Sequence, residues 1–243
     1  MQQRTFAIGD IHGGYRALIQ VLERADITSA DRLIFLGDYV DGWSESDRVI
    51  EKLIQLDRQF SCIFLRGNHD ALFQEWLDTR EVNDRWLING GNSTLKTYQC
   101  LDSDKLERHR TFLKNLRNYY IDSENRLFLH AGFTNLNGPK KEYYDYVLYW
   151  DRSLWETAVA TDKRLRPEDA WYPKRFTHFN EIFIGHTPVT GIGKNLPTQM
   201  LNLWNVDTGA GFRGKLSLLD IDSKEVFQSD PVYTLYPKEK GRN

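Results

Sequence analysis

Five short segments of this sequence combine a glycine with histidine, aspartate or asparagine, and each of them adjoins an apolar run. Four of the six histidines of the chain fall within them. Glycine lets the backbone turn sharply, so that a neighbouring polar side chain can point into a common cleft. The sequence therefore predicts one polar site that is built from GDIHG at 9–13, GDYVDG at 37–42, GNHD at 67–70, HAG at 130–132 and GHTP at 185–188.

The side chains in these segments are of the types that bind divalent metals. Carboxylates, asparagine and neutral imidazole, without a thiolate, suit harder cations such as Mn²⁺, Fe²⁺ or Zn²⁺. Taken singly, an Asp-x-His after a strand is more often a turn or a helix cap, and His130 alone would be a core histidine. Five such segments in one chain favour a metal site over turn chemistry.

Strand and helix patterns alternate ahead of these motifs. Short apolar runs at 5–8, 32–36 and 61–65 predict strands, and apolar residues at helical spacing between them predict helices. This order implies parallel strands joined by crossover helices. Ligands bind beyond the carboxyl ends of such strands, which is where the polar segments lie.

The rest of the chain predicts a helix at 105–120 and strands at 127–130, 182–184, 201–206 and 215–221. The stretch 139–180 is aromatic, charged and weakly periodic, and we expect an elaborated excursion near the site instead of a separate domain. The last residues, 237–243, predict a disordered tail. The sequence as a whole predicts one α/β (α+β) domain over 1–243.

Composition excludes several classes of protein. The 243 residues are 40% hydrophobic and 27% charged, which is typical of a folded globular protein. A net charge of −2 gives no broad basic face, so we expect no nucleic-acid partner. Two cysteines exclude a disulfide framework and favour a reducing cytoplasm. No long apolar run predicts a membrane span, and the early strand leaves no room for a signal peptide. The oligomeric state is not predicted.

The ordered motifs resemble those of the calcineurin-like metallophosphoesterases, from Thr5 to about Ile221. Within this superfamily the chain is similar to the bacterial serine/threonine phosphoprotein phosphatase branch. GHTP at 185–188 and NVDTGA at 205–210 carry that finer likeness. The resemblance implies a metallophosphoesterase-type β-sandwich flanked by helices, with four layers in the order αββα.

The resemblance also implies a binuclear metal centre in which Asp38 bridges two ions. The implied ligands are Asp10, His12 and Asp38 for the first ion, and Asp38, Asn68, His130 and His186 for the second. Mn²⁺ is the expected metal, with Fe or Zn as alternatives. A hydroxide shared by the ions would attack phosphorus in line. His69 would protonate the leaving oxygen and Asp41 would orient His69, although Asp41 before Gly42 also fits an Asx turn.

Arginines should complete a phosphate site, because a guanidinium matches phosphate geometry. Arg152, in the sequence Trp-Asp-Arg, resembles a phosphate-binding arginine of bacterial members, and Arg66 either faces the cleft or buttresses it. The branch usually has arginine where this chain has Gly42. The candidate replacements also fit as solvated surface charges; they are Arg48, Arg85 and Arg213. Asp70 stands where the branch usually has glutamate.

Three functions follow from these observations. The leading one is a dimetal phosphomonoesterase of the serine/threonine protein phosphatase type, with a phosphorylated protein or a small phosphate ester as substrate. The second is a hydrolase of dinucleoside polyphosphates such as diadenosine tetraphosphate, because aromatic residues between Tyr143 and Trp171 could stack on adenine. The third, supported by the missing arginine alone, is a metal-binding interaction module without catalysis.

Overall fold

The strands form two mixed five-stranded sheets in the computed structural model, which describes residues 3–242. The first sheet has the order β10-β9-β1-β2-β3 and the second the order β4-β5-β6-β8-β7. The strands are β1 Thr5–Ile8, β2 Arg32–Phe35, β3 Ser61–Phe64, β4 Tyr119–Ile121, β5 Arg126–Leu129, β6 Glu181–Ile184, β7 Thr198–Met200, β8 Leu203–Asn205, β9 Ser217–Asp220 and β10 Val226–Gln228.

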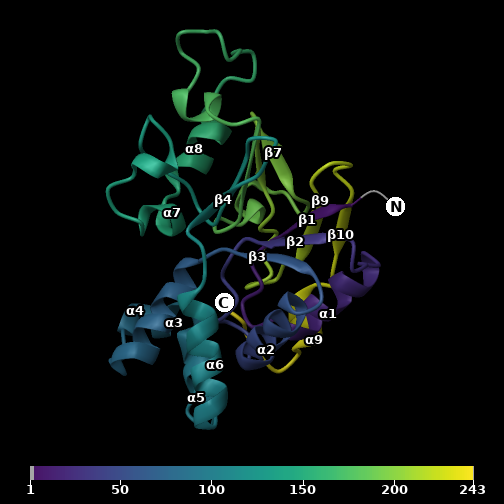
Figure 1. Cartoon of the computed structure of the whole chain (residues 1–243), viewed down its shortest axis with the longest axis vertical. Coiled ribbons are helices and arrows are strands. Elements are labelled where there is room, and N and C mark those ends of the chain that lie inside the picture. The colour runs from purple at the N-terminus through teal and green to yellow at the C-terminus, as the bar shows by residue number, and fades with distance from the viewer. Residues whose placement is uncertain (1–2, 243) are drawn as a thin grey trace.

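Helices cover the outer face of each sheet (Figure 1). The first sheet packs mainly against α1, α2, α3 and α6, and the second against α7 and α8. The helices are α1 Tyr15–Arg24, α2 Ser46–Asp57, α3 Asn68–Thr79, α4 Asp84–Trp86, α5 Asn92–Tyr98, α6 Ser103–Lys114, α7 Val147–Trp150, α8 Ser153–Ala160 and α9 Val232–Leu235. Helices α7 and α8 belong to the stretch 139–180.

Alternating side chains explain why the two sheets form a sandwich. In β1, Phe6 and Ile8 pack toward the helices, whereas Ala7 lies in the core between the sheets. In β6, Ile182 packs toward α8 and Phe183 lies between the sheets. Because neighbouring residues of a strand face opposite ways, each strand serves two cores. The predicted four-layer αββα sandwich is confirmed.

Each sheet directs the carboxyl ends of its parallel strands toward the predicted site. In the first sheet β1, β2 and β3 are parallel, and in the second β5, β6 and β8 are parallel. The polar segments follow these strands, as the sequence predicted. The two sheets meet there, since the backbone N–H of His186 after β6 lies 3.1 Å from Oδ2 of Asp10 after β1.

Two predicted segments differ in the structure. The helix expected at 105–120 ends at Lys114, because Tyr119–Ile121 pairs with β5 as an antiparallel strand and aromatic and β-branched residues favour strands. The tail expected to be disordered is ordered over 237–242; the Arg242 N–H donates to the carbonyl of Gly211 at 2.9 Å. Residue 243 lies outside the described residues. Within 3–242, no helix is long and apolar enough to cross a membrane.

A candidate metal centre and its cavity

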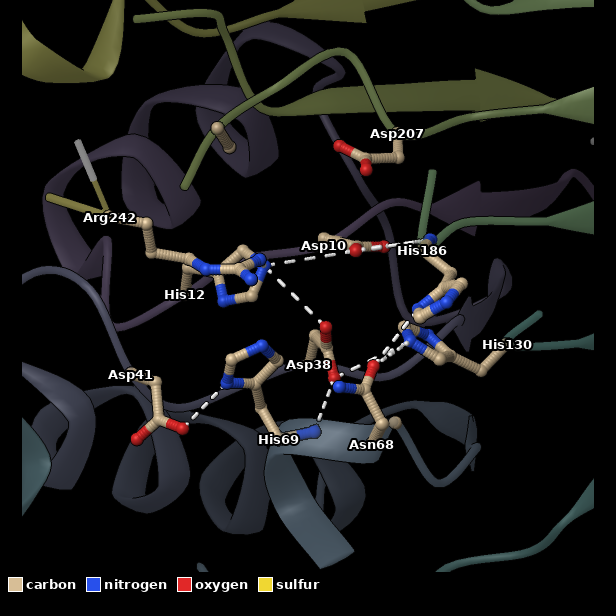
Figure 2. A network of polar contacts seen from close by, with 12 residues as sticks. Asp10, His12, Asp38, Asp41, Asn68, His69, His130, His186, Asp207 and Arg242 are labelled. Carbon is tan, nitrogen blue, oxygen red and sulfur yellow. Dashed lines mark hydrogen bonds and ion pairs between the residues drawn. The ribbon is translucent and has the colours of Figure 1, made fainter. Parts of the chain in front are cut away.

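The six predicted metal ligands come together at the meeting point of the two sheets, and all of them are buried (Figure 2). The loops that carry them turn sharply. The backbone φ angles of His12, Asp38 and His186 are +51°, +54° and +68°, and that of Asp41 is +71°. Non-glycine residues adopt this left-handed conformation at a cost, and such residues cluster at functional sites. The strained turns aim these side chains inward.

Asp38 lies at the centre of the cluster. Its Oδ2 is 3.5 Å from Nε2 of His12, and its Oδ1 is 3.4 Å from Nε2 of His130. Two groups of side chains around it have the spacing of metal ligands: His12, Asp38 and His69 form one, and Asp38, His130 and His186 form the other. Asp38 is the member that the two groups share, which suits a bridging carboxylate between two ions.

Hydrogen bonds from Nδ1 to backbone carbonyls orient the two imidazoles nearest Asp38. Nδ1 of His12 donates to the Val40 carbonyl at 3.1 Å, and Nδ1 of His130 donates to the Leu36 carbonyl at 2.8 Å. Each ring therefore keeps a proton on Nδ1 and turns Nε2 toward Asp38. This arrangement is typical of metal-binding histidines. The donor set fits divalent ions.

Asp10 and Asn68 complete the cluster. Oδ1 of Asn68 lies 3.2 Å from Nε2 of His130 and 2.9 Å from Nδ1 of His186. Asp10 accepts the His186 N–H, and its Oδ2 lies 3.8 Å from Nε2 of His12. Asn68 thus lies with the second group, and Asp10 lies beside His12 of the first, as the resemblance implied.

Several buried carboxyl groups crowd this site. Burial and the Asp207 carboxylate raise the pKa of Asp10 well above its usual value. Burial, opposed by a hydrogen bond from the Gly209 N–H, raises the pKa of Asp207 to about 6. Burial acts against the charge of Asp38 too, but the imidazoles of His130 and His69 outweigh it and hold the pKa of Asp38 well below its usual range. Divalent cations would neutralise this excess of negative charge.

The histidine pKa values follow the same local charges. Burial would lower the pKa of His130, but the Asp38 and Asp10 carboxylates outweigh it and raise that pKa to about 10. Burial, and after it the Arg242 guanidinium, holds the pKa of His12 well below its usual value. Burial and the nearby His130 lower the pKa of His186 likewise. Metal uptake should therefore release a proton from His130.

Asp70, which replaces the glutamate usual in the resembled branch, ties two site loops together. Its Oδ2 accepts the backbone N–H groups of Asp38 and Gly67 at 2.8 and 2.9 Å, and its Oδ1 accepts that of Tyr39 at 2.9 Å. Burial and the Asp38 charge raise the pKa of Asp70 to about 7. The three N–H donors fix the loop after β2 against the first turn of α3.

His69 and Asp41 form a buried pair at the edge of the cluster. The ring Nδ1 of His69 donates to Oδ2 of Asp41 at 2.7 Å, and the indole Nε1 of Trp86 donates to the same oxygen at 2.7 Å. Oδ1 of Asp41 is buried without a hydrogen-bond partner among the described residues. Asp41 therefore holds His69 through Nδ1 and does not bond the other ring nitrogen, Nε2.

Replacing Trp86 with phenylalanine should lower turnover by about tenfold, because Asp41 would lose a charge-assisted hydrogen bond and hold His69 less firmly. Steady-state kinetics with a substrate that has a poor leaving group measures this effect, and KM and metal content should stay unchanged. Trp76→Phe is the matched control, since Trp76 packs on Trp86 at 5.9 Å between ring centroids, whereas the side-chain donors to Asp41 within residues 3–242 are Trp86 and His69. Equal losses in the two variants would assign the effect to packing.

A cavity of about 400 Å³ opens beside the cluster. Its lining includes the buried His69 and His186 and, at its rim, the exposed Trp150. The other lining residues are Asn68, Leu72, Asn83, Arg85, Asn89, Arg152 and Arg242. Nε of Arg152 lies 3.4 Å from Nε2 of His186. The predicted position of Arg152 beside the metal site thus agrees with the geometry, and its role as a substrate ligand stays a prediction.

Arg66 buttresses the fold and does not line this cavity. Its guanidinium donates to Oε1 of Gln74 at 2.5 Å and to the Leu113 carbonyl at 3.1 Å. Of the two alternatives for Arg66, the geometry favours the buttress, because Gln74 on α3 and the Leu113 carbonyl on α6 take up its donors. Of the three suggested replacements for the arginine missing at Gly42, Arg85 lines the cavity, Arg48 pairs with Glu45 and Arg213 is exposed elsewhere.

Sequence reasoning missed two residues of the site. Nothing in the local sequence linked the indole of Trp86 to Asp41. Arg242 lies in the tail, yet its Nη1 is 3.1 Å from Nε2 of His12. No periodicity or motif marks Arg242, because its place depends on packing between distant parts of the chain.

Comparisons with known proteins agree with this geometry. The family profile described as calcineurin-like phosphoesterase matches residues 4–208. Bis(5'-nucleosyl)-tetraphosphatase PrpE [asymmetrical] of Anoxybacillus flavithermus is 28% identical over 97% of each chain. A crystal structure provisionally described as a diadenosine tetraphosphatase has a TM-score of 0.63 at 17% identity, covering 93% of this chain and 92% of that one. A cold-active protein tyrosine phosphatase mutant has a TM-score of 0.60 at 17% identity, with 95% and 81% covered.

Proposed function

The chain belongs to the calcineurin-like phosphoesterase family, and from that premise we propose that it is a divalent-metal-dependent hydrolase of dinucleoside tetraphosphates. The name of the Anoxybacillus relative supports this substrate class. The order of the two leading hypotheses from the sequence is therefore reversed: the dinucleoside polyphosphate comes first and the phosphorylated protein second. The metal is proposed to be Mn²⁺, with Fe or Zn as alternatives.

The observation that carries the proposal is the lining of the cavity. Arg85, Arg152 and Arg242 surround it, and Trp150 at its rim is 42% exposed. A phosphomonoester carries about two negative charges at one phosphorus, whereas a bridge of four phosphates spreads its charge along a chain. Several guanidinium groups fit such a chain better than a single phosphoryl group. An exposed indole offers a face for a nucleobase.

The side chains of this protein would divide the work of hydrolysis. The ligand set is proposed to hold two ions, which when bound would polarise the phosphoryl group and favour hydroxide near neutral pH. Arg152 is proposed to bind a non-bridging phosphate oxygen beside His186. His69 is proposed to donate its proton from Nε2 to the leaving oxygen, while Asp41 holds Nδ1 and so fixes the ring.

The proposal is tested with Mn²⁺-loaded protein and three substrates: diadenosine tetraphosphate, a set of phosphoserine and phosphothreonine peptides, and an aryl phosphate. Chromatography of the products is expected to show unequal cleavage of the dinucleotide to ATP and AMP, with the highest kcat/KM of the three substrates. A higher kcat/KM for the peptides would restore the protein phosphatase hypothesis. No turnover of any substrate by fully loaded protein would favour the non-catalytic metal-binding module.

A further inference from the structure

The segment 236–242 is fastened across the fold, beside the metal-binding cluster. The ring of Tyr236 stacks on Trp43 at 5.2 Å between centroids, and the Glu239 carboxylate accepts the Ser44 N–H at 3.0 Å. The Arg242 N–H donates to the Gly211 carbonyl at 2.9 Å. Three separate contacts thus bring Arg242 to a defined position.

The side chain of Arg242 runs through a gap that glycines leave open. A Cβ placed on Gly42 or on Gly90 would lie 3.1 Å from Cγ of Arg242, and one placed on Gly211 would lie 3.0 Å from its Cδ. These spacings are tighter than ordinary van der Waals contact, so larger residues would crowd the arginine stem. The Asn89 carbonyl accepts the Nε–H at 3.1 Å and holds the end of the stem.

Gly42 is the position where the resembled branch usually has arginine. Its backbone φ is +104°, a conformation that residues with a side chain rarely adopt. An arginine at position 42 would therefore be strained, and its stem would begin where Arg242 already lies.

Arg242 and Arg152 reach the cluster at two different histidines. Nη1 of Arg242 is 3.1 Å from Nε2 of His12, and Nε of Arg152 is 3.4 Å from Nε2 of His186. Figure 2 shows Arg242 beside His12 and His186 on the far side of Asp38. Both arginines line the same cavity. An anion that enters this cavity would meet a guanidinium at each end of the ligand cluster.

We propose that Arg242 is a phosphate-binding residue that replaces the arginine missing at Gly42, and that together with Arg152 it clamps the phosphoryl group that is cleaved. The assignment deepens the proposed function and rests on it for the identity of the whole substrate. The N–H of Nη1 now faces the lone pair of His12 that an ion would take. An ion bound at His12 would leave this N–H free for a phosphate oxygen.

The test measures binding of inorganic phosphate to Mn²⁺-loaded protein by calorimetry, so that it does not depend on which ester is the substrate. Arg242→Ala is expected to weaken phosphate binding by about 10- to 100-fold, the range for a lost charge-assisted hydrogen bond. Arg242→Lys should retain part of the affinity, because it keeps the charge and loses the fork. Arg213→Ala is the matched control: Arg213 is exposed and lines a different cavity near the same segment.

Metal content and thermal melting of each variant accompany the titration. Unchanged phosphate affinity in folded Arg242→Ala would overturn the assignment. Tighter metal binding with unchanged phosphate affinity would overturn it as well, and would make Arg242 a plug that competes with the ion at His12. If the wild type failed to cleave diadenosine tetraphosphate while Arg242→Ala still lost phosphate affinity, the proposed substrate would be wrong. The phosphate-binding role of Arg242 would still be supported.

Discussion

Replacing Asp38 with asparagine is expected to remove both ions and to lower turnover by at least about 10³-fold, because metal catalysis supplies several kcal/mol and each 1.36 kcal/mol is a factor of ten. Oδ1 of Asp38 faces His130 and Oδ2 faces His12, at 3.4 and 3.5 Å. The asparagine amide is neutral and has one oxygen, so it cannot supply a charged oxygen ligand to each of the two ligand groups that now share Asp38. Metal analysis of the purified protein and kcat for the best substrate measure the two effects.

Asparagine tests the ligand role with little disturbance of the fold. Its remaining oxygen can still accept the backbone N–H of His69, which donates to Oδ1 of Asp38 at 2.9 Å. The first turn of α3 should therefore keep its place. Asp31→Asn provides the control, since Asp31 is also a buried carboxylate but pairs with Arg4 outside the site. Retention of two ions in Asp38→Asn would show that Asp38 does not bridge them.

Local signals in the sequence predicted the strands and the meeting of the polar motifs at one site, whereas the sandwich and the ligand set were implied by the family resemblance. Each motif places its polar residue directly after a buried strand, and parallel strands bring their carboxyl ends to one edge. Apolar runs such as 5–8 and 182–184 were long enough to show the strands. Asp10, Asp38 and His130 therefore lie where their motifs indicated.

The residues that sequence reasoning missed or left open depend on contacts between distant segments. Arg66 precedes a site glycine, but its long side chain reaches Gln74 and the Leu113 carbonyl. Contacts with α3 and α6 set the direction of that side chain, and no local pattern near position 66 encodes them. Arg242 is 230 residues from His12 in the chain, and its route depends on the small size of Gly90 and Gly211. A polar, charged tail carries no sign of such docking.

The distinction between a metal ligand and a proton donor is decided at His69. Its ring lies within ligand distance of His12 and Asp38, so distance alone would allow it to bind an ion. The hydrogen-bond acceptor at its Nδ1 differs from that of the other two rings. The metal-facing His12 and His130 donate from Nδ1 to backbone carbonyls, whereas His69 donates from Nδ1 to the carboxylate of Asp41. The Asp41 carboxylate holds Nδ1, so Nε2 is the ring nitrogen left to face a leaving oxygen.

His69→Asn is accordingly expected to lower kcat by roughly 10²–10⁴-fold for esters with poor leaving groups, the usual contribution of a general acid, while leaving metal content intact. The loss should be much smaller for an aryl phosphate with an acidic phenol, because its leaving oxygen needs no proton. His130→Asn is the matched comparison. It removes an imidazole of the same size from the cluster, and metal content should fall because Nε2 of His130 faces Asp38 at 3.4 Å.

Kinetics across leaving groups and metal analysis together separate the two roles of histidine in this site. Equal metal loss in the His69 and His130 variants would make His69 a ligand, and the Asp41 contact would then be the outer contact of a metal-binding imidazole. A loss of kcat that is uniform across leaving groups, with metal retained, would instead mean that His69 acts on phosphate binding. Only a loss that grows with leaving-group basicity fits proton donation, because that is the step whose need for a proton changes along the series.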